Sequence, residues 1–321
     1  MTSAMGGVAV VLNPTTVADI GELKAEISQR ANLAGLAEPL YLETTEDDPG
    51  AGMVVEAVRA GVRLILCCGG DGTVAACAGA LADLGVDGSV VGVALAVVPI
   101  GTGNLLARNL DLPLGLPDAL DVAFGPGRRP LDVLKAGEHR FVVMAGLGFD
   151  AALIRDTDDD LKGRIGWLAY LGGLAKAFKR SERAWFELTV DSAPPVRLRG
   201  VGVLVGNVGQ VQGGLALLPD ARPDDGVADV IVLSPRRQSD WPLLIWRLIR
   251  RQPDHGSRAH VFRGATVTIT ADRELPVEYD GDFDGAAAGM RVEVMARAIV
   301  LCVPEGRAPA IPAEWDGRTA R

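Results

Sequence analysis

Residues 63–73 read Arg-Leu-Ile-Leu-Cys-Cys-Gly-Gly-Asp-Gly-Thr, an apolar run that ends in glycines, and a helical pattern follows from about Val74 to Leu84. Glycines at a strand-to-helix turn allow the backbone to approach a phosphate chain, and the helix N-terminus offers it unpaired N–H groups. A plain tight turn would explain the glycines but not Asp71, because a carboxylate repels phosphate unless Mg²⁺ or a hydrogen-bond network intervenes. The stretch therefore predicts an α/β fold with a phosphate-binding turn.

A second glycine-rich turn, Pro99-Ile-Gly-Thr-Gly-Asn104, follows the next apolar run at 91–98 and again precedes a helical pattern. Adjacent parallel strands end at the same edge of a sheet, so we expect the two turns to line one crevice and one nucleotide site. Neither turn is a Walker A motif, since no Gly-Lys-Ser/Thr follows, and neither is a GxGxxG fingerprint.

Apolar runs alternate with amphipathic stretches through the first third of the chain, with strands expected at 8–12 and 40–42 and helices at 20–36 and 53–60. Continuous Val, Leu and Ile runs are typical of a parallel sheet covered on both faces. The pattern predicts an N-terminal doubly wound α/β nucleotide-binding domain over residues 1–128.

From about residue 129 the pattern changes to short, alternating strands joined by Gly, Pro and Asp turns, which predicts a C-terminal antiparallel β-sandwich domain over 129–304. The turn-rich segment 125–130 is the expected boundary, and the tail 305–321 could pack back on the first domain. The expected strands are 131–135, 140–146, 184–191, 197–207, 227–233, 265–271, 276–279 and 290–303.

Net charge, the length of apolar runs and the cysteine positions indicate which partners and which cell compartment to expect. A net charge of −9 argues against a nucleic-acid partner, and no apolar run approaches the roughly 20 residues that span a bilayer. The N-terminus lacks the basic region of a signal peptide, so we expect a cytoplasmic protein that meets any lipid at the inner membrane surface. No pattern indicates an oligomeric state, although a dimer is compatible with the sequence. Four cysteines are expected to be reduced and buried: Cys67, Cys68, Cys77 and Cys302.

The two glycine turns and five later motifs occur in the order seen in the diacylglycerol kinase catalytic-domain family, which this chain resembles from Asn13 to about Pro304. That family includes bacterial diacylglycerol kinases, sphingosine kinases and ceramide kinases. The later motifs are Gly146-Leu-Gly-Phe-Asp150, Val205-Gly-Asn207, Gly213-Gly214, Pro219-Asp-Ala-Arg-Pro-Asp-Asp-Gly226 and Tyr279-Asp-Gly-Asp282.

The resemblance implies a lipid kinase that uses ATP and Mg²⁺ to phosphorylate the hydroxyl of a diacylglycerol-like or sphingoid lipid. It implies that Asp280 is the general base, with Asp132 and Asp282 in a supporting acidic network. It implies a metal site at the Asp225 carboxylate and two backbone carbonyls, those of Arg222 and Val227. The implied ATP-binding residues are Asn13, Thr45, Gly69, Gly70, Asp71, Gly72, Thr73, Gly101, Thr102 and Asn104.

Three positions depart from the family pattern. Residues 13–17 lack the glycine of the usual Asn-Pro-x-Ser-Gly, and Leu105 stands where the bacterial diacylglycerol kinases have Asp. Asp282 replaces the Glu of the usual Asp-Gly-Glu, which keeps the charge on a shorter arm. These departures leave the acceptor lipid open. They also leave two alternatives, an NAD-kinase-like enzyme and a regulator without catalysis.

The acidic run Asp280-Gly-Asp-Phe-Asp-Gly285 also fits the start of a calcium loop, but Arg291 stands where that loop requires Glu. A solvated acidic hairpin is the stronger alternative. We expect Asp280→Asn to abolish phosphorylation while leaving the fold largely intact.

Helical patterns at 162–179 and 241–251 combine apolar residues with Trp and basic residues, so each could pack on the core or lie at a membrane interface.

Overall fold

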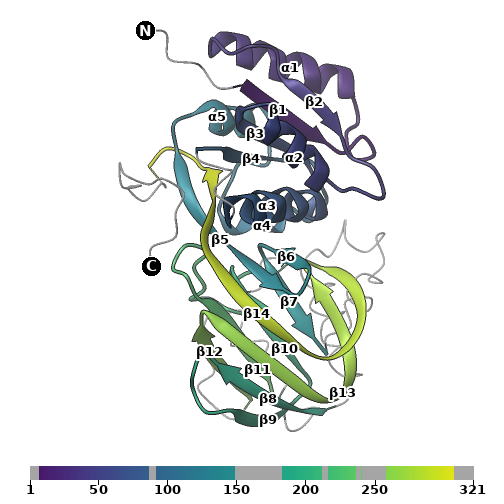
Figure 1. The fold of residues 1–321 in the computed structure, drawn as a ribbon, viewed down its shortest axis with the longest axis vertical. Helices are drawn as coiled ribbons and strands as arrows, with labels where there is room; N and C mark the ends of the chain where they lie inside the picture. The colour runs from purple at the N-terminus through teal and green to yellow at the C-terminus, as the bar shows by residue number, and fades with distance from the viewer. Residues whose placement is uncertain are drawn as a thin grey trace. The chain divides into compact units, whose positions relative to one another are not determined.

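A computed structural model describes residues 7–86, 92–148, 183–211, 216–235, 240 and 258–306. The chain forms two compact units (Figure 1). Unit 1 comprises residues 1–133 and 295–321, and unit 2 comprises residues 134–294. Strands β5 (Arg128–Ala136) and β14 (Asp282–Cys302) contribute residues to both units. The helices expected at 162–179 and 241–251, the Gly213-Gly214 motif and the tail beyond 306 lie outside the described residues.

Unit 1 contains a parallel sheet in the order β4-β3-β1-β2 (Figure 1). Its strands are β1 (Gly7–Leu12), β2 (Leu40–Glu43), β3 (Val62–Gly69) and β4 (Ala94–Pro99). The end of β14 adds a further parallel strand beside β4, with Val300 opposite Ala94. Because β1, β3 and β4 are buried along nearly their whole length, their sequences are continuous rather than alternating.

Helices cover both faces of this sheet. α1 (Ile20–Leu33) and α5 (Leu116–Phe124) share a core with Val8, Val10 and Leu12 of β1. α2 (Ala51–Arg59) and α3 (Asp71–Val86) lie on the other face, where Cys67 of β3 contacts Cys77 of α3. The predicted doubly wound α/β architecture is therefore confirmed. All four cysteines are free and buried, as expected.

Unit 2 is built from antiparallel strands in the order β12-β11-β10-β7-β13-β14, and β8 and β9 extend from β13. This confirms the predicted β-sandwich class. The strands not yet given are β6 (His139–Phe141), β7 (Met144–Leu147), β8 (Ala184–Val190), β9 (Val196–Gly200), β10 (Gly202–Gly206), β11 (Ala228–Leu233), β12 (Ala259–Gly264) and β13 (Thr266–Tyr279).

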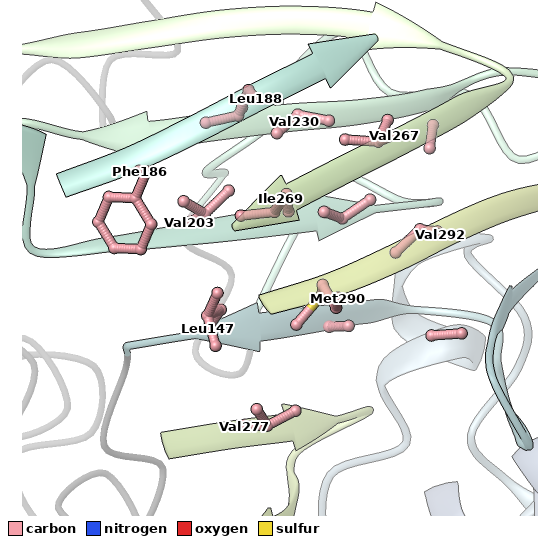
Figure 2. Close-up of a cluster of buried hydrophobic side chains, with 14 of the residues drawn as sticks. Leu147, Phe186, Leu188, Val203, Val230, Val267, Ile269, Val277, Met290 and Val292 are labelled. Atoms are coloured by element: carbon pink, nitrogen blue, oxygen red, sulfur yellow. The ribbon is translucent and has the colours of Figure 1, made fainter. Parts of the chain in front are cut away.

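Figure 2 shows the core of unit 2, where side chains from several strands meet. Phe186 of β8, Val230 of β11 and Ile269 of β13 are each at most 1% exposed. Alternate residues point the other way, so that Val203 and Val205 belong to this core whereas Leu204 does not. The other face of β10, β7 and β13 carries Leu204, Gly146 and Glu278, and there too Leu204 and Glu278 are buried, at 3% and 8% exposed.

Several boundaries differ from those expected from the sequence. The separate strands expected at 265–271 and 276–279 are one strand, β13, and the single strand expected at 197–207 is divided into β9 and β10 at Val201. Helix α3 begins at Asp71 rather than near Val74, while β12 and α5 were not predicted at all. Within the described residues, no helix is long and apolar enough to cross a membrane.

Candidate functional site

The predicted nucleotide-binding residues gather at one edge of the unit 1 sheet. Asn13 follows β1, Thr45 lies just beyond β2, Gly70 follows β3, and Gly101 lies just beyond β4. Since the four strands are parallel neighbours, their carboxyl ends share this edge, which we call the carboxyl edge. The expectation that both glycine turns lie at one edge is confirmed.

The two glycine turns touch each other through their backbones. A Cβ atom built on Gly101 would lie 2.5 Å from the Cα of Gly70, closer than real Cβ atoms come. The Ile100 N–H donates to the Gly69 carbonyl at 3.3 Å, which fixes the same contact. A Cβ on Gly69 would lie 2.7 Å from the Oγ1 of Thr73, so that glycine makes room for the buried Thr73 side chain. Glycine is required here by close approach of one turn to the other.

Asp71 connects the first turn to the second. It is the first residue of α3, and its Oδ1 accepts a hydrogen bond from the Leu105 N–H at 2.6 Å. Asn104, in the left-handed conformation at φ 49°, donates from Nδ2 to the Gly101 carbonyl at 2.7 Å. The sequence analysis required Mg²⁺ or a hydrogen-bond network to explain a carboxylate beside a phosphate site. The hydrogen bond from the Leu105 N–H shows that residues following the second turn belong to such a network around Asp71.

The remaining residues of the carboxyl edge differ in how open they are. Gly72, Thr102 and Thr45 are exposed, whereas Asn13 is half-buried. The Asn13 Oδ1 accepts from the Thr15 N–H and hydroxyl at 3.0 and 2.7 Å, so Thr15 closes this turn without the glycine usual in the family. A cradle of backbone N–H groups at the start of α3, bordered by exposed polar residues, fits the phosphates of a nucleotide.

In unit 2, Asp280 and Gly281 form the two-residue turn between β13 and β14. Both have positive φ, 48° and 92°, as the turns preferred in tight hairpins require. The Asp280 carboxylate is buried and accepts three backbone N–H groups, from Val142 at 2.9 Å, Val143 at 2.8 Å and Met144 at 2.9 Å. Its own N–H donates to the Met144 carbonyl.

Asn207 of the Val-Gly-Asn motif binds the same segment. Its N–H donates to the Val143 carbonyl at 2.9 Å and its Nδ2 to the Val142 carbonyl at 3.2 Å. Two of the family-type motifs, both later in the sequence, therefore bind this segment: Asp280 binds residues 142–144, and Asn207 binds residues 142 and 143.

Glu278, two residues before Asp280, is a second buried carboxyl group of this turn, and the sequence analysis did not single it out. It is 8% exposed and lies opposite Gly146 in the pairing of β13 with β7. Burial first, and then the charges of Asp280 and Asp282, raise its pKa to about 7. We call Glu278–Asp282 the acidic turn.

The other acidic residues of this hairpin have separate partners or face solvent. Asp282 is exposed and pairs with Tyr279 across the turn, and Asp284 forms an ion pair with His139 at 3.1 Å. Within the described part of the chain, no group of three acidic, His or Cys side chains could hold a metal ion. The sequence analysis offered a solvated acidic hairpin as the alternative to a calcium loop. This hairpin is present, but its first aspartate, Asp280, is buried.

The predicted metal site at Asp225 contains an internal cation. Arg263 of β12 contacts the Asp225 carboxylate at 2.7 Å and the buried Asp229 carboxylate at 2.9 Å. Asp225 also accepts the Val227 N–H at 3.3 Å. Arg263 thus neutralises Asp225 in the described geometry, and the predicted metal role of Asp225, Arg222 and Val227 stays a prediction.

Asp132, predicted for the acidic network, lies on β5 and is fully buried. Its Oδ1 accepts the N–H of Arg297 at 2.6 Å, and Arg297 has a positive φ of 50°. The carboxylate therefore holds β14 at a residue with unusual backbone conformation. Its predicted place in an active-site network stays a prediction.

Comparison with known protein families supports the two-part organisation. Residues 7–136 match the family described as diacylglycerol kinase catalytic domain, and residues 142–303 match the family described as YegS C-terminal NAD kinase beta sandwich-like domain. The two matches together span most of the chain.

Individual relatives carry lipid kinase names. A protein of Chromohalobacter salexigens described as "Probable lipid kinase YegS-like" is 29% identical over 266 residues, which cover 83% of this chain and 84% of the relative. One of the same description from Pseudomonas putida is 33% identical over 257 residues, 79% of this chain and 81% of the relative.

Among solved structures, that of a diacylglycerol kinase from Bacillus anthracis superposes with a TM-score of 0.76 at 22% identity, over 94% of this chain and 99% of that one. At this level of identity the likeness shows the fold.

Proposed function

The chain belongs to the family of YegS-like lipid kinases with a diacylglycerol kinase catalytic domain, and we propose that it transfers the γ-phosphate of ATP to a hydroxyl of a diacylglycerol-like or sphingoid lipid. The observation that carries the proposal is the carboxyl edge, where the turns after β3 and β4 touch at Gly70 and Gly101. Phosphoryl transfer depends mainly on alignment and charge neutralisation, which such a backbone cradle supplies.

The donor is proposed to bind with its phosphates at the N-terminus of α3. The N–H groups of the first helical turn have no partner within the helix, and the dipole there favours anions. Gly72 and Thr102 are exposed at this edge and Asn13 and Thr45 border it. Mg²⁺ bound to ATP would neutralise charge on the β- and γ-phosphates.

The acceptor hydroxyl must lose a proton during the transfer, and the acidic turn of unit 2 is the proposed place for it. The family pattern assigns this role to Asp280. The lipid is proposed to be met at a membrane surface, with peripheral contact at the inner face and without a nucleic-acid partner, since the net charge is −9.

The proposal is tested with radiolabelled ATP, Mg²⁺ and the purified chain. Diacylglycerols, sphingoid bases, ceramides and polyprenols are presented in mixed micelles, and NAD is presented in solution. We expect label in one lipid class and none in NAD. Gly101→Ala, which alters the donor turn, should lower incorporation into the lipid.

Two results would overturn the proposal. Label in NAD with none in lipid would establish a soluble nucleotide kinase. Binding of ATP by calorimetry without transfer to any acceptor would establish a regulator that has lost catalysis.

A further inference from the structure

The loops at the carboxyl edge of unit 1 are acidic. The residues that lead from the four strands into the helices there, 13–19, 44–50, 70–71 and 100–104, include neither Lys nor Arg. Their acidic members are Asp19, Glu46, Asp47, Asp48 and Asp71. A nucleoside triphosphate that binds at this edge adds further negative charge, so a cation close to its phosphates would offset the repulsion.

Arg108 supplies a cation directly after the second glycine turn. It lies in the short helix α4 (Leu105–Asn109), which follows that turn. Its Nε donates to the Gly103 carbonyl at 2.9 Å, and this hydrogen bond directs the side chain back toward the turn. The guanidinium is therefore held at the carboxyl edge.

Gly103 connects this guanidinium to the first glycine turn. A Cβ atom built on Gly103 would lie 2.5 Å from the Asp71 Oδ2, so the two turns touch here as they do at Gly70 and Gly101. Gly103 thus contacts both Arg108 and Asp71, which is the first residue of α3. This places the guanidinium beside the helix N-terminus at which the donor phosphates are proposed to bind.

The outer part of the Arg108 guanidinium is open. The side chain is exposed, and among the residues that the structure describes only Gly103 accepts a hydrogen bond from it. A guanidinium has five N–H donors in a planar fork, so the N–H groups of its two terminal nitrogens remain for a ligand. Such a fork can donate two parallel hydrogen bonds to one phosphate group.

We propose that Arg108 binds the phosphate chain of the donor nucleotide and supplies the positive charge that the two glycine turns lack. This inference rests on the proposed function, because it takes the donor to be bound at the N-terminus of α3. In a Walker A site a lysine at the end of the glycine loop contacts the phosphates. Here the cation comes from the helix after the second turn, and the Gly103 carbonyl orients it.

The test is calorimetric binding of nucleotides to the purified chain with Mg²⁺ and without lipid. We expect Arg108→Gln, whose amide can still donate to the Gly103 carbonyl, to weaken ATP binding by about tenfold or more. The affinity for AMP, measured by competition with ATP, should change much less because AMP has a single phosphate. Arg108→Lys keeps the charge without the fork and should lose less ATP affinity than Arg108→Gln.

The salt dependence of ATP binding is a second readout, which a change in the shape of the turn would not alter. Salt screens interactions between exposed charges, so the ATP affinity of the wild type should fall more steeply with KCl than that of Arg108→Gln. Arg59→Gln is the matched control, because Arg59 is an exposed arginine in the last turn of α2, which leads to the opposite end of β3. It should change neither the affinity nor its salt dependence.

The outcomes separate this inference from the proposed function. Equal losses of ATP and AMP affinity in Arg108→Gln would overturn the inference, because they would show that Arg108 only shapes the second turn. An unchanged ATP affinity or an unchanged salt dependence would overturn it as well. A wild type that binds ATP with the expected dependence on Arg108 but phosphorylates no lipid overturns the proposed function alone. Failure of the wild type to bind ATP overturns both.

Discussion

Asp280 is a residue whose contacts predict an effect on stability as well as on catalysis. Its buried carboxylate accepts three backbone N–H groups. The amide of Asn replaces one of the two oxygens by an NH2 group, which would then face a backbone N–H group instead of accepting from it. We expect Asp280→Asn to lower the free energy of unfolding by about 2–3 kcal/mol in urea denaturation. This revises the expectation from the sequence that the fold would be largely unaffected. Asp282→Asn, at an exposed position two residues on, is the control and should leave stability nearly unchanged.

Glu278 predicts a pH dependence of stability with a defined sign. Its pKa is about 7 in the folded protein against an ordinary value of 4.5, so the folded state binds more protons between these values. Stability then falls as pH rises through this window, and the full loss, about 3 kcal/mol, is present at about pH 8. Glu278→Gln removes this loss and should gain stability over the wild type near pH 8 but not below about pH 4.5.

Urea denaturation across this pH range measures the effect, with Glu274→Gln as the control. An equal difference between Glu278→Gln and the wild type at both ends of the range would contradict the raised pKa.

At the scale of single residues, the sequence predicted which residues lie at strand ends better than it predicted which residues touch each other. The glycine motifs correctly placed Gly70 and Gly101 at strand ends, because a strand-to-glycine-to-helix pattern is local. Glu278 was missed because its burial depends on pairing with Gly146, which is far away in sequence. Local patterns do not show which carboxyl group a distant strand will cover.

The contact between the two glycine turns makes a prediction at the scale of elements. In Gly101→Ala the new Cβ would lie 2.5 Å from the Gly70 Cα, so the turns after β3 and β4 must separate. We expect a loss of about 1–3 kcal/mol in the free energy of unfolding. Calorimetry should show ATP binding weakened by about tenfold or more, because the cradle loses its shape. Gly7→Ala, whose Cβ would meet nothing closer than 3.6 Å, should change neither quantity appreciably.

The position of Arg263 on β12 predicts how the loop before β11 responds to metal. Arg263→Ala leaves the Asp229 carboxylate, 3% exposed, without its cation, and we expect a loss of about 2–3 kcal/mol. Because the guanidinium already neutralises Asp225, Mg²⁺ should not change the melting temperature of the wild type in the absence of nucleotide. Arg291→Ala breaks an exposed ion pair with Glu293 and is the control, with an expected effect below about 1 kcal/mol.

A clear rise in the melting temperature of the wild type on adding Mg²⁺, reversed by a chelator, would contradict this prediction. It would favour the metal site inferred from the family pattern.

The sequence predicted those helices and strands whose hydrophobic period and whose length both indicate the same type of element. The runs that became β1, β3 and β4 are continuous and apolar, which is typical of buried parallel strands. Helix α5 was missed because it has only nine residues and carries Pro117 at its start, where proline also reads as a turn. β12 was missed because its buried ends, Ala259 and Gly264, are small and carry little hydrophobic signal.

At the scale of the whole molecule, unit 1 is discontinuous in sequence. Unit 2 is inserted between Val133 and Met295, and the chain returns to unit 1 to place the end of β14 beside β4. This returning segment buries Ile299, Leu301 and Val303, each at most 3% exposed. At about 1.5–3 kcal/mol for each large apolar side chain, its burial is comparable to the total stability of many domains.

Two fragments of unit 1 therefore have opposite expected outcomes. Residues 1–133 alone lack the returning strand and leave the edge of β4 open, so we expect this fragment to be unfolded or aggregated by circular dichroism and light scattering. A second fragment joins residues 1–133 to 295–306 through a short Gly/Ser linker. The contact of Asp132 with the Arg297 N–H at 2.6 Å places the two ends close enough for such a linker. We expect this fragment to fold cooperatively and to bind ATP. Cooperative folding of residues 1–133 alone would contradict the requirement for β14.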